Sequence, residues 1–142
     1  MASRRKGRIL AFQALYCWES TGIPPETLTD FSWLGENWQN LDAEIAAFAR
    51  LLLAGTVENV GQIDSMIKRH LKNWDISRLN RVDFAILRMS VYTLMYQKDM
   101  PPSVVIDEAI GIAKEFGADD SYRFVNGVLD GIRKTLVLEQ GG

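Results

Sequence analysis

Apolar residues recur along this chain three or four positions apart, which is the spacing of one face of a helix. No stretch alternates apolar and polar residues long enough to indicate a β-strand. The sequence therefore predicts an all-α fold of about seven helices. They are expected at about residues 3–20, 25–31, 41–59, 61–71, 77–97 and 103–116, with a last helix that starts after Asp119, Asp120 or Ser121 and continues past residue 136.

Residues at the ends of these segments support the assignments. Ser3 and Ser103 are suited to cap the helices that follow them, because a serine oxygen accepts a hydrogen bond from a free N–H of the first turn. Gly117 stands where a left-handed residue commonly ends a helix. Gly127 and Gly131, four residues apart in the last helix, predict a flat notch that a ligand or another backbone could approach.

The segment at 77–97 is apolar on several sides. A helix of this kind is expected at the centre of a fold or at a subunit interface, so a homodimer is left open. The 142 residues are otherwise expected to form one domain covering 1–142.

Composition excludes several classes of protein. With one cysteine, Cys17, and one histidine, His70, the chain lacks the residues for a disulfide framework or a zinc site, and we expect no metal. No apolar run approaches the roughly 20 residues that a membrane helix needs. The apolar stretch 9–18 is followed by Glu19 and not by the small-residue cleavage site of a signal peptide, so a cytoplasmic protein is expected. Phosphate-binding glycine loops and the serine hydrolase motif are missing, which predicts that the protein is not an enzyme and has no cofactor.

The net charge of -2 conceals a strong segregation. Residues 1–8 carry four basic side chains and no acid, whereas residues 9–49 carry six acids and no base. The basic residues are Arg4, Arg5, Lys6 and Arg8. Cations at a helix N-terminus are disfavoured by the helix dipole, so a compensating partner is expected, and phosphate is the natural one. The alternative is a frayed terminus that only aids solubility.

Further along the first helix, Gln13 and Tyr16 could meet an unpaired base, since aromatic rings beside basic grooves stack bases. Taken alone, Tyr16 also fits a core or interface position. His70 lies among lysine and arginine and is interpreted as part of a solvated basic face. The pair Asp119 and Asp120 is interpreted as helix capping rather than acid–base chemistry.

Several blocks of the sequence resemble the NusB family of bacterial transcription antitermination factors. They are RRKGR (4–8), AFQALY (11–16), AILR (85–88), VIDEAI (105–110) and FGADDSYRFVNGVLD (116–130). The resemblance implies two packed three-helix subdomains with an additional short helix. It also implies a non-enzymatic protein that binds boxA-type single-stranded RNA of ribosomal RNA leaders with the small-subunit ribosomal protein NusE, and that joins other Nus factors on RNA polymerase.

The resemblance also suggests site residues. Arg4, Arg5, Lys6, Arg8 and Tyr16 match the RNA-facing first helix of the family, and Asp120 and Phe124 match positions associated with RNA binding. Asp83 stands where the family often has a glutamate that contacts the ribosomal protein, and the shorter aspartate has less reach. Replacing both Arg5 and Arg8 by alanine is expected to weaken RNA binding with little change in melting temperature. Replacing Asp83 by lysine is expected to disrupt pairing with the ribosomal protein.

Two other functions fit the same pattern. The RNA-binding appendage of ribosomal RNA cytosine methyltransferases resembles this fold, although the chain ends at Gly142 without the cofactor-binding domain of such an enzyme. A purely protein-binding helical module is the other alternative. Strong synergy between the RNA and the ribosomal protein is expected only of the antitermination factor.

Overall fold

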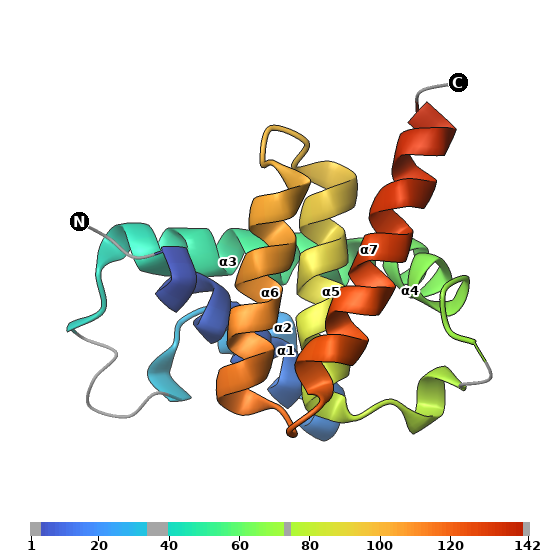
Figure 1. Ribbon diagram of the computed structural model, residues 1–142. Helices are drawn as coiled ribbons and strands as arrows, with labels where there is room; N and C mark the ends of the chain where they lie inside the picture. Colours follow the sequence, from blue (N-terminus) through green and yellow to red (C-terminus); the bar gives the residue numbers. More distant parts are fainter. Residues whose placement is uncertain (1–3, 34–39, 73–74, 141–142) are drawn as a thin grey trace.

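The computed structural model describes residues 4–33, 40–72 and 75–140, and within these ranges it is helical without β-strands (Figure 1). The predicted all-α fold with seven α-helices is confirmed. Their bounds are α1 Arg4–Thr21, α2 Pro25–Leu28, α3 Ala43–Glu58, α4 Val60–Lys68, α5 Arg81–Tyr96, α6 Pro102–Phe116 and α7 Ser121–Gln140, with a 3₁₀ helix η2 at Ile76–Arg78. No helix among the described residues is long and apolar enough to cross a membrane.

The helices form two groups. α5, α6 and α7 pack against one another, while α1 packs on α3 and short α2 lies against both. Figure 1 shows α5, α6 and α7 grouped side by side, with α3 crossing behind them. α1 and α3 also contact α5, and α4 packs on α5 and α7, so one apolar core is continuous through both groups.

α5 is the central element of this core. Every residue from Asp83 to Leu94 is buried, including its polar ones. The central position predicted from its apolar faces is confirmed, because the chain itself covers all sides of the helix. Arg88 on α5 is stabilised by two hydrogen bonds to Asp64, at 2.9 and 2.8 Å, and its guanidinium lies 3.7 Å from the centre of the Phe84 ring.

The start of α5 differs from the prediction of a helix at 77. The Asp75 side chain accepts a hydrogen bond from the N–H of Ser77 and closes η2 as a separate turn. The chain is then extended at Leu79, and the Asn80 side chain accepts from the N–H groups of residues 82 and 83 to cap α5. Two local caps in succession therefore divide what the apolar spacing presents as one helix.

The ends of α6 also differ from the prediction. α6 begins at Pro102, before the expected cap Ser103, because proline suits a first turn in which its missing N–H has no partner to lose. Gly117 is extended, with φ -92° and ψ -175°, and is not left-handed. A Cβ atom at position 117 would lie 2.7 Å from the carbonyl oxygen of Ala113 and from Cβ of Ser121, so close packing requires the glycine.

α2 ends at Leu28, three residues before the predicted end at Phe31. Phe31 has a φ of 59°, which is unfavourable for a bulky residue, yet its side chain is only 1% exposed. It packs with Leu10, Ile45 and Ala49 in a second apolar cluster between α1 and α3. Burial of the Phe31 ring therefore offsets the backbone strain, and the left-handed conformation at Phe31 directs the chain away from the axis of α2. The expected cap Ser3 and residues 34–39 of the predicted connection lie outside the described residues.

Candidate nucleic-acid interface

The basic residues at the start of the chain form the first two turns of α1. Arg4 and Lys6 are exposed, and the Arg4 guanidinium lies 4.5 Å from the centre of the Phe48 ring on α3. An arginine against an aromatic face keeps its N–H groups available at its edge. This part of the arm presents positive charge to the solvent.

Arg5 and Arg8 instead converge on one carboxylate, that of Glu108 on α6. Arg5 donates to it from Nε at 3.0 Å and from Nη2 at 2.6 Å, and Arg8 donates from Nη1 at 3.1 Å. The hydrogen bond from Arg5 lowers the pKa of Glu108, and the same bond raises the pKa of Arg5. Glu108 therefore compensates two of the four cations within the protein.

The two arginines differ in burial. The Arg5 side chain is 41% exposed, whereas that of Arg8 is 9% exposed and lies over the Phe48 ring. Burial lowers the pKa of Arg8. Arg8 is therefore placed to hold the arm against Glu108 and Phe48, and losing Arg5 and Arg8 together is now expected to lower stability as well as RNA binding.

Gln13 and Tyr16 lie further along α1 and line a hollow of about 290 Å³. The remaining lining residues are Phe12, Cys17, Val82 and Phe116. Tyr16 is 39% exposed, so it is not a core residue, and the rings of Phe12 and Phe116 pack with their centres 5.3 Å apart. The arrangement offers an apolar, partly aromatic surface to a flat ring.

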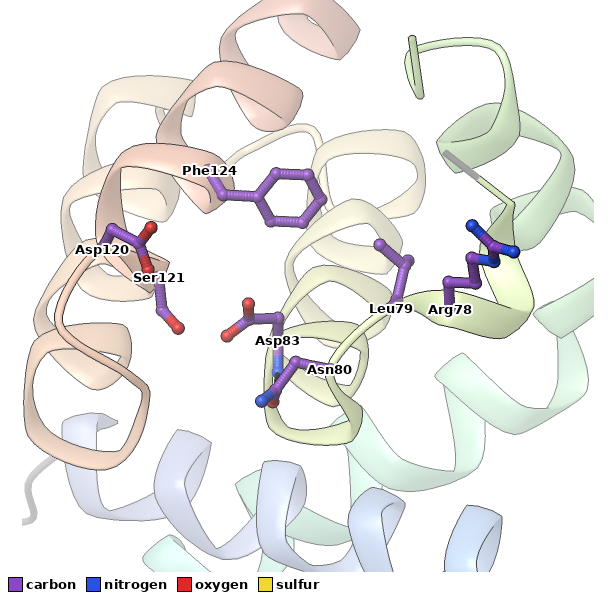
Figure 2. A pocket seen from close by; sticks show the side chains of 7 residues that line it. All are labelled: Arg78, Leu79, Asn80, Asp83, Asp120, Ser121 and Phe124. Atoms are coloured by element: carbon purple, nitrogen blue, oxygen red, sulfur yellow. Dashed lines mark hydrogen bonds between the residues drawn. The ribbon is translucent and has the colours of Figure 1, made fainter. Parts of the chain in front are cut away.

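Asp83, Asp120 and Phe124 meet at a second hollow, of about 310 Å³. Figure 2 shows Asp83 on α5 facing Asp120 and Ser121 at the start of α7, with the Phe124 ring one turn further along α7. Asp120 directly precedes α7, and its carbonyl oxygen accepts hydrogen bonds from the N–H groups of Arg123 and Phe124. Arg78, Leu79 and Asn80 complete the lining.

Asp83 is the unusual residue of this hollow. It is 7% exposed, and its buried Oδ1 has no hydrogen-bond partner in the described structure. Burial raises the pKa of Asp83, and the charge of Asp120 raises it further, while a hydrogen bond with Ser121 acts in the opposite direction. A cationic group that enters the hollow would give Oδ1 of Asp83 a partner and would lower the pKa of Asp83, because it would pair with the carboxylate in place of the water that burial removes.

Two other sequence interpretations change. His70 does not belong to a solvated basic face: Nδ1 lies 3.0 Å from the Met66 carbonyl oxygen, and Nε2 lies 2.8 Å from Oγ1 of Thr135 on α7. It also fills the predicted notch at Gly131, where a Cβ atom would lie 2.9 Å from the His70 ring. Gly127 is open.

Sequence reasoning missed Glu108, which holds the arm in place, and Gly111 beside it on α6. The available signal was a glutamate and a glycine one helical turn apart in a segment otherwise suited to a helix. Their partners are about 100 residues earlier in the chain, and no local pattern connects the two segments.

Comparison with known proteins gives a consistent result over nearly the whole chain. A family model described as the NusB family matches residues 5–134. The chain is 55% identical to the transcription antitermination protein NusB of Treponema pallidum (strain Nichols), over 93% of each chain, and 43% identical to that of Geobacter sp. (strain M21), over 96% of this chain and 97% of the relative. Among solved structures it is similar to T. maritima NusB, with a TM-score of 0.81 and 37% identity over 94% of this chain and 92% of that one. It is also similar to a chain in the complex of antitermination factors NusB and NusE with dsRNA, with a TM-score of 0.83 and 31% identity over 93% and 96%.

Proposed function

This chain belongs to the NusB family, and on that premise we propose that it is a transcription antitermination factor. It binds the single-stranded boxA element of ribosomal RNA leaders together with the ribosomal protein NusE, and it links the RNA to other Nus factors on the elongating RNA polymerase. It acts in the cytoplasm as one RNA-binding domain of residues 1–142, by bridging its partners and not by catalysis. The observation that carries the proposal is the match to antitermination proteins along almost the entire chain.

The proposed RNA surface begins at the start of α1. Arg4, Arg5 and Lys6 attract phosphates, and Arg8 holds the arm against α3 and α6. Tyr16 and Gln13 lie two to three turns along the same helix, where the half-exposed ring can stack an unpaired base and the amide can bond to its edge. This division between phosphate contacts and base contacts favours a single strand, whose bases are free to leave the stack.

We propose that RNA and NusE bind next to each other at the hollow that contains Asp83. Asp83 and Asp120 bring two carboxylates to a site with one lining cation, Arg78, which suits a basic side chain of a ribosomal protein. Phe124, on the α7 side of the hollow, and Asp120 are the residues offered to RNA. The separation of a basic α1 start from an acidic hollow supports one protein holding two unlike partners.

The test is the affinity for a fluorescently labelled boxA-type single strand, measured by anisotropy with and without NusE. We expect NusE to tighten RNA binding at least tenfold, because the RNA is then held by contacts made within one complex of this chain and NusE. The variant Arg4→Ala/Tyr16→Ala should weaken binding with little loss of stability, since both side chains are exposed. A duplex of the same sequence is the matched control, because a similar chain was solved with dsRNA.

Equal affinity with and without NusE would contradict the proposal and favour an RNA-binding appendage or a protein-binding module. For the NusE contact, Asp83→Asn is a sharper test than lysine, because a buried ammonium could disturb the fold. We expect Asp83→Asn to weaken NusE pairing while leaving the RNA affinity of the chain alone unchanged. Unchanged pairing would remove Asp83 from the interface.

A further inference from the structure

Arg5 lies directly against the backbone of α6. Its guanidinium is paired with Glu108 and also covers Gly111, one turn further along the helix. A Cβ atom at position 111 would lie 2.5 Å from Nη2 and 2.6 Å from Nη1 of Arg5. The guanidinium thus occupies the space that any other side chain at this position would fill.

The carboxylate that holds Arg5 is itself fixed. Glu108 accepts from the buried Arg8 at 3.1 Å on Oε1, and from Arg5 at 2.6 Å on Oε2. The pKa of Glu108 is lowered by these arginines, so it stays ionised at neutral pH. Arg5 is therefore held between a glycine surface and a carboxylate that cannot easily turn away.

The orientation of Arg5 leaves part of it for a ligand. Its bonds to Glu108 come from Nε and Nη2, so the N–H groups of Nη1 lie outside this ion pair. The side chain is 41% exposed even though it is held on one side. A guanidinium that is planar, ordered and open at one end is suited to bind a phosphate.

Gly111 makes α6 less stable than an alanine would, and its contact with Arg5 explains why a glycine is present. A glycine inside a helix is less favourable than alanine, and Gly111 lies within α6 without a positive φ that would need a glycine. The three atoms nearest to a Cβ at position 111 all belong to the Arg5 guanidinium, so a side chain there would first displace Arg5.

We propose that Gly111 and Glu108 form a cradle on α6 that positions Arg5 for a phosphate of the bound RNA. The two are positioning residues, acting through Arg5 without touching RNA. The proposal rests on the proposed RNA-binding function. Ordering a long side chain before binding saves part of its conformational entropy, which corresponds to about three- to tenfold in affinity.

The decisive variant is Gly111→Ala, which keeps all four cations and the net charge. The added methyl must displace the far end of Arg5, while alanine favours the helix, so the melting temperature should stay the same or rise. We expect affinity for a labelled boxA-type single strand in the presence of NusE to fall about three- to tenfold. Gly61→Ala is the matched control, because Gly61 is an exposed helical glycine with open space around it, and it should bind as the wild type does.

A double-mutant cycle distinguishes positioning from a general structural effect. In an Arg5→Ala background, Gly111→Ala should cause no further loss, because the side chain that it displaces is gone. Wild-type affinity for Gly111→Ala alongside weakened Arg5→Ala would overturn the cradle. Tighter binding by Gly111→Ala would also overturn it, because α6 would then be withholding Arg5 from RNA. If Arg5→Ala itself binds normally and NusE has no effect, the proposed function has failed instead.

Discussion

Arg8 and Arg5 share a partner and a charge, yet the structure predicts very different contributions to stability. Arg8→Ala removes a side chain that is 9% exposed, whereas Arg5→Ala removes one that is 41% exposed. In either variant Glu108 keeps one arginine, so neither leaves a carboxylate without a partner. Arg5 donates to Glu108 from two nitrogen atoms and Arg8 from one, so a larger loss of stability for Arg8→Ala has to come from the burial of Arg8.

The magnitude for Arg8 follows from three contributions. Losing a hydrogen bond between charged groups costs about 1.5 to 3 kcal/mol, and losing two buried methylenes costs about 1.6 kcal/mol. About 2 kcal/mol of side-chain entropy is regained. We expect Arg8→Ala to lower the free energy of unfolding by about 2 kcal/mol, and Arg5→Ala, whose side chain is 41% exposed, by less than about 1 kcal/mol.

The assay is urea denaturation followed by far-ultraviolet circular dichroism, which reports the helices directly. Arg8→Met is the matched control: it removes the charge but keeps most of the apolar stem, so its loss should be about half that of alanine. If Arg8→Ala and Arg5→Ala agree within about 0.5 kcal/mol, Arg8 is not an anchor and the reasoning from burial is wrong.

Three further outcomes are expected, each from the unfolding midpoint in urea. Asp64→Ala should lower the free energy of unfolding by about 2 to 3 kcal/mol, because it leaves the buried Arg88 guanidinium without its two best hydrogen bonds; a loss below about 0.5 kcal/mol would contradict this. Gly55→Ala should cost roughly 1 kcal/mol or more, since its Cβ atom would overlap the ring of Tyr92, and a stabilised variant would show that the ring moves freely. Asp83→Asn should stabilise the protein by about 1 kcal/mol at neutral pH. Burial raises the pKa of Asp83 in the folded state, so the folded wild type is favoured while Asp83 is protonated, below the unfolded pKa, and loses this stability as pH rises through the folded pKa. The stabilisation by Asp83→Asn should therefore shrink toward about pH 4. A stabilisation that does not change with pH would exclude burial of the charge as its cause.

Helix content and the central position of α5 were predictable because both depend on periodicity. A buried helix needs apolar residues on the sides that are covered, and α5 is covered on all of them. The boundaries were less predictable, because capping residues compete locally. Asp75 and Asn80 both close a turn near the start of α5, and which residues each cap binds depends on the path of the chain that leads into the core.

The candidate site divides in the same way. The residue types at the start of α1 predicted a polyanion partner, and the resemblance predicted Asp83, Asp120 and Phe124 as site residues. That these three share one hollow follows from the packing of α7 against α5, which no local pattern contains. Tyr16 is likewise a residue type that fits a core position, and only its place on α1 leaves its side chain half-exposed.

Spacing and composition alone predicted that the chain is helical, that the helix at 77–97 is covered on several sides, and that positive charge is concentrated at the N-terminal end. These properties depend on the spacing and the composition of residues that are close together in the sequence. The packing of α1 against α3 and α6 sets how far each of these cations is exposed. Glu108 reaches Arg5 and Arg8 across about 100 residues, and the free energy of each charge depends on burial and on that distant partner, so one arginine became an anchor while the other stayed open to solvent.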